Sequence, residues 1–160
     1  MIENKDKKLN LWMRIFFVIY VIAMLYFLFF ADAMGRMSSD TMVGYNTKLF
    51  KEIHRYLINW RQIGFSIAFL NIGGNIIGFL PLGFLLPFVN AKNRSFFRTL
   101  LICVYVTMTV EVIQLIFHVG CFDVDDMFLN TVGGICGYVI FMIGSMLRRK
   151  KHGKEEATRI

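Results

Sequence analysis

The sequence predicts an all-α, polytopic membrane protein with four transmembrane helices and an amphipathic helix on the outer surface. The first observation is composition: of 160 residues, 56% are apolar and only 18% are charged, which is unusual for a soluble domain. The second is that charges are nearly absent from four windows, each long enough to cross about 30 Å of hydrocarbon. We expect one domain over residues 1–160, with spans at about 11–31, 63–89, 97–117 and 127–147.

The first span, residues 11–31, has no charge after Arg14, whose side chain can reach the headgroups. A secretory signal peptide is the alternative, because basic residues precede the span and residues 31–33 read Ala-Asp-Ala, which resembles a cleavage site. The apolar run exceeds the usual signal-peptide core of about 7–15 residues. A retained helix is therefore expected, and cleavage stays the alternative.

Residues 46–62 of the first outer loop repeat apolar side chains at helical spacing, with the basic residues largely on other faces. The apolar positions are Leu49, Ile53, Leu57 and Trp60. This pattern predicts an amphipathic helix on the outer surface, with its basic groups among lipid phosphates. The alternative is a solvated cap packed over the ends of the spanning helices.

The remaining spans differ in their internal residues. The second span contains no charge but includes Pro81, which should kink the helix because it offers no N–H to the Ile77 carbonyl. The third span contains Glu111, and the fourth ends at the basic run 148–151. Glycines in the second and fourth spans predict close helix packing. They are Gly73, Gly74, Gly78, Gly133, Gly134 and Gly137.

The formal net charge of +7 is distributed by loop, which favours membrane topology over nucleic-acid binding. Basic residues gather in the N-terminal tail, at 92–98 and in the C-terminal tail, so the positive-inside rule predicts that both termini are cytoplasmic. The loop at 118–126 then faces outward, and its charged residues are all acidic. The first outer loop also carries basic residues, but the inner segments carry more.

Polar side chains recur at helical spacing inside the last three spans. The pairs are Asn71 and Asn75, Glu111 and Gln114, and Asp126 and Asn130. Each pair occupies one face of its helix, and counting about 1.5 Å per residue from the outer ends puts the three faces at a similar depth. They predict a ligand-binding pocket in the outer leaflet that opens toward Asp123, Asp125 and Asp126.

These polar residues also have structural interpretations. Interhelical Asn and Gln hydrogen bonds hold membrane helices together at about 0.6–2 kcal/mol each. Glu111 favours a functional role more strongly, because a carboxyl inside a membrane needs a partner or a proton. The triad Asp123, Asp125 and Asp126 could hold a divalent cation, although capping of the fourth helix also explains Asp125 or Asp126. We expect no other cofactor.

Two stretches resemble the VanZ-like family of bacterial membrane proteins: NIGGNIIGFLPLGFLLP at 71–87 and EVIQLIFHVGCFDVDDMFLNTVGGICGY at 111–138. The family is named after a protein of glycopeptide-resistance gene clusters that lowers susceptibility to teicoplanin. The resemblance implies a location in the bacterial cell membrane. It also implies that the characteristic residues are Asn71, Asn75, Pro81, Gly83, Glu111, Gln114, Asp123, Asp126, Asn130 and Gly134.

Three functions fit these residues. The first is a cell-envelope protein that binds a lipid-linked wall precursor or a lipid headgroup in the polar pocket and lowers susceptibility to glycopeptide or other lipid-targeting antibiotics. The second is a membrane-embedded hydrolase or transferase acting on a lipid headgroup, with Glu111 or Asp126 in catalysis and a cation held by the aspartates. The third is an ion or proton transporter, for which four helices would have to oligomerise.

Overall fold

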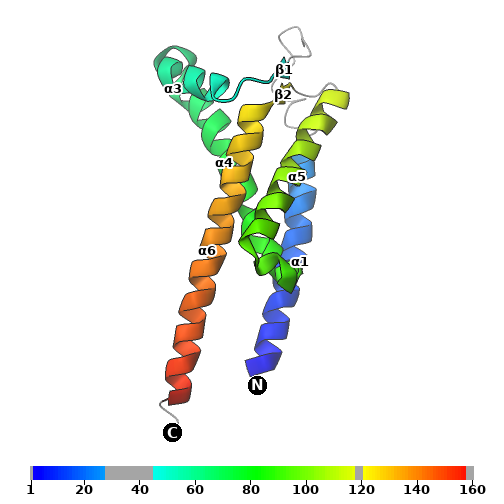
Figure 1. Ribbon diagram of the computed structural model, residues 1–160, viewed down its shortest axis with the longest axis vertical. Coiled ribbons are helices and arrows are strands. Elements are labelled where there is room, and N and C mark those ends of the chain that lie inside the picture. The colour runs from blue at the N-terminus through cyan, green and yellow to red at the C-terminus, as the bar shows by residue number, and fades with distance from the viewer. Residues whose placement is uncertain (1, 28–44, 118–120, 158–160) are drawn as a thin grey trace.

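The computed structural model describes residues 2–27, 45–117 and 121–157 (Figure 1). Nearly all of these residues are helical, which confirms the predicted all-α class. The elements are, in order, α1 (Ile2–Tyr26), β1 (Tyr45–Asn46), α3 (Lys51–Ile63), α4 (Phe65–Val89), the 3-10 turn η2 (Ala91–Arg94), α5 (Phe96–Ile116), β2 (Phe122–Asp123) and α6 (Val124–Ala157).

The described residues include four helices that are long and apolar enough to cross a membrane. These segments are Lys8–Tyr26, Phe65–Val89, Phe96–Ile116 and Val124–Lys150. Large apolar side chains cover their outer surfaces: Ile22 is 63% exposed, Leu101 68% and Tyr105 72%. Apolar surface of this extent is stable against lipid and unfavourable in water. The chain is therefore a polytopic membrane protein, as predicted.

The helix boundaries differ from the predicted spans at several ends. Helix α1 begins at Ile2, well before the apolar run, and α6 continues to Ala157, about three turns beyond the predicted end at 147. Both extensions are rich in charged residues, so the helices project past the hydrocarbon region. The end of the first predicted span at 28–31 and the alternative cleavage site at 31–33 lie outside the described residues.

Figure 1 shows the two chain ends at one end of the helix bundle and the strands with α3 at the other. We call these the terminal end and the sheet end. Helix α6 packs most extensively against α4, and also against α5, while α1 packs against α4. An even number of crossings is what returns both ends of a chain to the same side.

The apolar core lies between α4 and α5, where Phe79, Leu82 and Leu86 pack with Cys103 and Val110. Helix α1 covers this cluster with partly buried side chains. One of them, Tyr20, also donates a hydrogen bond from its hydroxyl to the Gly78 carbonyl oxygen at 2.8 Å. The contact fixes the position of α1 on α4 within the apolar interior.

Four glycines allow α4 and α6 to approach closely. A Cβ atom at Gly83 would overlap the Gly134 carbonyl, one at Gly133 the Ile76 carbonyl, and one at Gly137 the Leu80 carbonyl. Backbone contact of this kind is typical of small residues at membrane helix interfaces. The same expectation was wrong for Gly74 and Gly78, because a Cβ atom at either position would have no neighbour within 4 Å.

Helix α3 lies across the sheet end and diverges from the bundle (Figure 1). It starts after Phe50, whose φ is 67°, and it ends at Ile63, just before Gly64, whose φ of 101° turns the chain into α4. None of its residues is buried, and Leu57 remains 62% exposed. The predicted amphipathic helix is thus present, but it begins at Lys51 rather than 46 because the chain first forms strand β1.

Candidate functional site

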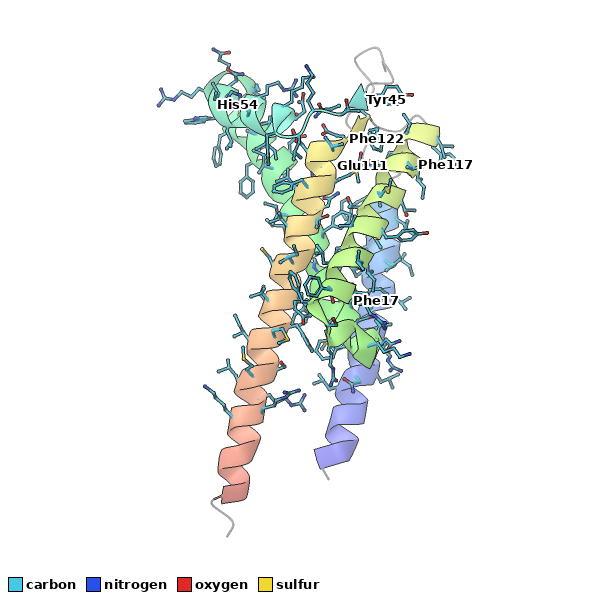
Figure 2. The ribbon with its side chains drawn as sticks, viewed as in Figure 1. Phe17, Tyr45, His54, Glu111, Phe117 and Phe122 are labelled. Carbon is cyan, nitrogen blue, oxygen red and sulfur yellow. The ribbon has the colours of Figure 1, made fainter. Side chains whose placement is uncertain are left out.

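Most of the predicted site residues meet at the sheet end, where five elements converge. We call this group the polar junction. It consists of Asn46, Asn75, Glu111, Asp123, Asp125 and Asp126. Figure 2 shows Glu111 and Phe122 at the same end of the bundle as Tyr45. The members come from β1, α4, α5, β2 and α6, so the junction exists only in the folded chain.

Strands β1 and β2 form the outer part of the polar junction. They pair in parallel, with Tyr45 opposite Phe122 and Asn46 opposite Asp123. The Asn46 amide donates to Asp123 Oδ1 at 2.8 Å, and the same oxygen accepts the Asp125 backbone N–H at 2.8 Å. Asp123 therefore joins the segment before α3 to the start of α6.

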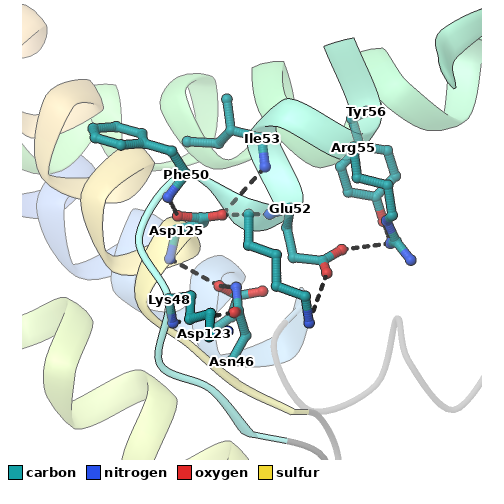
Figure 3. Close-up of polar contacts among 10 residues, drawn as sticks. Asn46, Lys48, Phe50, Glu52, Ile53, Arg55, Tyr56, Asp123 and Asp125 are labelled. Carbon is teal, nitrogen blue, oxygen red and sulfur yellow. Dashed lines mark hydrogen bonds and ion pairs between the residues drawn. The ribbon is translucent and has the colours of Figure 1, made fainter. Parts of the chain in front are cut away.

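Asp125 caps helix α3 from the first turn of α6 (Figure 3). Its carboxylate accepts the backbone N–H groups of Phe50, Glu52 at 2.7 Å and Ile53 at 3.2 Å. Helix α3 has no side-chain cap of its own, so Asp125 satisfies donors that the helix start leaves open. Its negative charge also favours that end of the helix dipole.

Glu111 is almost completely buried in the polar junction, with only 2% of its surface exposed. Its Oε2 accepts the Asp123 backbone N–H at 2.9 Å, which ties α5 to β2. The carboxyls of Asp123 and Asp126 lie close enough to act on it electrostatically. Glu111, Asp123 and Asp126 thus lie close together at the sheet end of the bundle.

Asn75 and Asp126 connect α4 to α6 inside the polar junction. The Asn75 amide donates to Asp126 Oδ1 at 2.6 Å, and both side chains are partly exposed. Asn71, predicted for the same face, is instead exposed and donates to the Ile67 carbonyl of its own helix at 2.8 Å. The structure therefore brings one member of this pair to the junction and leaves the other outside it.

A second polar contact lies deeper, between α5 and α6. The Asn130 amide donates to Thr107 Oγ1 at 2.9 Å, and both residues are buried. The Asn130 Oδ1 atom is buried without a hydrogen-bond partner among the described residues. Gln114, predicted beside Glu111, is half-buried one turn further along α5. An unpaired buried acceptor is uncommon in folded proteins and marks a place where a donor is missing.

Comparison with known proteins identifies the relatives of this chain. A model of the VanZ/LLP1 family matches residues 17–146, which include part of the first spanning helix, the second and third in full, most of the fourth, and the whole polar junction. The chain belongs to the VanZ/LLP1 family. It is also similar to Protein VanZ from Enterococcus faecium, with 30% identity over 107 residues that cover 67% of this chain and 66% of that protein. No solved structure matches the chain.

The aspartate triad of this VanZ/LLP1 member does not converge on one point. Asp125 faces the start of α3, Asp126 faces Asn75 and Asp123 faces Asn46. Among the described residues, no group of three or more His, Cys, Asp or Glu side chains is placed to hold a metal ion. The geometry therefore favours Asp125 as a helix cap, and the helix it caps is α3 rather than its own.

Two participants were missed by sequence reasoning. Thr107 lies one turn before Glu111 on the same face of α5, so helical spacing could have identified it. Asn46 had no such signal, because its partner Asp123 is 77 residues away and the two meet only through the β1–β2 pairing.

Proposed function

We propose that this VanZ/LLP1 protein binds the polar headgroup of a lipid-linked wall precursor at the polar junction and thereby lowers susceptibility to glycopeptide antibiotics. Membership of the VanZ/LLP1 family, together with the similarity to Protein VanZ, supports the association with glycopeptide resistance. We infer the ligand and its binding at the polar junction from the residues described next.

The observation that carries the proposal is the burial of Glu111 among partly exposed polar partners. A nearly buried acid with two more acids close by is costly to maintain, so such groups in membrane proteins tend to be functional. Asn75, Asp123 and Asp126 remain partly exposed beside it. Carboxylates and amides accept and donate the hydrogen bonds that sugar hydroxyls and peptide amides offer.

Helix α3 supplies a basic group, Arg61, for the phosphate part of such a ligand. Arg61 lies over the Trp60 ring, with its guanidinium carbon 5.2 Å from the ring centroid, and both side chains are exposed. Arg55 instead pairs with Glu52 at 2.6 Å, so its charge is already balanced. Arginine pairs well with phosphate, and an aromatic neighbour is common at the depth of lipid headgroups.

The first test measures teicoplanin susceptibility in a susceptible Gram-positive host that expresses the full chain. Glu111→Gln and Asp126→Asn should return the inhibitory concentration to that of the empty-vector strain, while membrane abundance stays unchanged. The matched control is Thr109→Val. Thr109 is exposed on the same helix, and its hydroxyl donates a hydrogen bond to the Tyr105 carbonyl of that helix. Full resistance in a well-expressed Glu111→Gln strain would contradict the proposal.

The second test separates binding from catalysis. Purified protein in lipid nanodiscs is incubated with a polyprenyl-pyrophosphate-linked saccharide, and the lipid is then extracted for mass spectrometry. We expect the lipid to be retained intact by the unsubstituted protein and to be lost by Glu111→Gln. A cleaved or transferred headgroup would favour the hydrolase or transferase alternative, and no retention at all would reject the ligand class.

A further inference from the structure

A groove of about 530 Å³ opens at the terminal end, between α1, α4 and α6 and next to η2. Its apolar wall is aromatic. Phe84 and Phe88 of α4 lie 5.8 Å apart between ring centroids, and Phe88 meets Phe141 of α6 edge-on at 5.1 Å. The groove is at the opposite end of the bundle from the polar junction, so the proposed function above does not use it.

Three arginines border this aromatic wall: Arg94 of η2, and Arg148 and Arg149 of α6. Within the part of the chain that the structure describes, the residues lining the groove include no acid. A volume of this size lies within the range of about 300–1,000 Å³ that is usual for ligand pockets. The groove thus offers an apolar surface on one side and a group of positive charges on the other.

The backbone that carries Arg94 is held rigidly by buried hydrogen bonds. The Asn93 amide donates to the Leu86 carbonyl at 3.2 Å, and the Thr99 hydroxyl donates to the Asn93 carbonyl at 2.8 Å. On the other side, the Tyr138 hydroxyl of α6 donates to the Arg94 carbonyl at 2.6 Å. A fixed backbone reduces the entropy that is lost when the arginine engages a ligand.

We propose that this groove binds an anionic phospholipid, with its phosphate at the three arginines and an acyl chain along the phenylalanine wall. Guanidinium groups form paired hydrogen bonds with phosphate oxygens. Basic pockets between spanning helices near a membrane surface are known to hold anionic lipid headgroups. The flanking surface is apolar, with Ile143 49% and Leu147 63% exposed, so lipid is the molecule that surrounds the groove.

The test is native mass spectrometry of the full chain in mild detergent, with equal amounts of phosphatidylglycerol and phosphatidylcholine added. We expect phosphatidylglycerol to bind about tenfold more tightly, because its headgroup carries a net negative charge that basic residues attract, whereas phosphatidylcholine carries none. Combining Arg94→Gln, Arg148→Gln and Arg149→Gln should abolish that preference. The charge control is Arg98→Gln, because Arg98 is exposed nearby but does not line the groove.

A second variant tests the apolar part of the groove without removing charge. Gly144 lines the groove, and an added Cβ there meets no atom within 4 Å, so Gly144→Leu should narrow the groove without disturbing the fold. We expect phosphatidylglycerol adducts to fall about tenfold, whereas Gly74→Leu, which is equally unhindered but lies elsewhere, should leave them unchanged. Equal binding of the two lipids, or undiminished preference in the triple variant or in Gly144→Leu, would overturn the proposal.

Discussion

Asp125 shows at the scale of one residue how a side chain can act on a distant part of the chain. It stands in the first turn of α6, yet its carboxylate holds the first turn of α3, 73 residues earlier. This anchor fixes a helix that buries none of its own residues. Phe50, which precedes α3 with a φ of 67°, is held on both sides, by Asp125 and by edge-on packing against Phe128 at 5.3 Å.

We expect Asp125→Ala to lower the free energy of unfolding by about 2–4 kcal/mol, because a hydrogen bond to a charged group contributes about 1.5–3 kcal/mol and three N–H groups lose their acceptor. The melting temperature in detergent should fall accordingly. Glu52→Ala is the control, since it removes only the ion pairs with the exposed side chains of Lys51 and Arg55 and should change stability by less than about 1 kcal/mol. Equal melting temperatures for the two variants would show that Asp125 does not anchor α3.

At the scale of elements, the contact between α4 and α6 organises the molecule. Gly133 and Gly137 of α6 face α4 carbonyls, and Gly83 of α4 faces the Gly134 carbonyl in return. This close approach brings Asn75 within hydrogen-bonding reach of Asp126 at the sheet end. The helix interface and the polar junction are therefore coupled, because a shift of α6 along α4 would separate that pair.

Gly137→Ala should destabilise the protein by about 1–3 kcal/mol, because the new methyl group would overlap the Leu80 carbonyl and force the two helices apart. Denaturation in increasing SDS, followed by intrinsic tryptophan fluorescence, would measure the change. Gly74→Ala provides the comparison: its surroundings are open, and alanine favours helix by up to about 1 kcal/mol, so stability should be unchanged or higher. A neutral Gly137→Ala would mean that α4 and α6 are further apart than the structure has them.

At the scale of the whole molecule, the two ends of the bundle carry different charged groups. The sheet end carries the acidic polar junction, and the terminal end carries the arginine-bordered groove. The positive-inside rule predicts that the terminal end faces the cytoplasm. On this orientation the polar junction faces the cell wall, where a lipid-linked precursor and a glycopeptide would both be present.

Cysteine labelling tests this orientation in intact cells. Cys121 is exposed at the sheet end beside β2, whereas Cys103 is buried in the core. A membrane-impermeant maleimide should therefore label the protein from outside, and Cys121→Ser should abolish the label. Cys136 lies within the span of α6, where the aqueous reagent does not reach it. Labelling only after the membrane is permeabilised would reverse the assigned orientation.

The sequence by itself determined the membrane class, the four spanning helices and the pairing of polar residues on α4, α5 and α6. These features follow from local rules, because hydropathy and helical spacing depend on neighbouring residues. It also singled out Glu111, since an acid inside an apolar run is conspicuous without any structure.

Only the tertiary structure decided which of those residues meet. Asn75 and Asn71 are equivalent by spacing, yet only Asn75 reaches Asp126. The strand pairing that joins Asn46 to Asp123 is non-local, and the role of Asp125 depends on where α3 begins. Helix rotation and long-range pairing arise from packing between segments far apart in the chain, which local patterns do not encode.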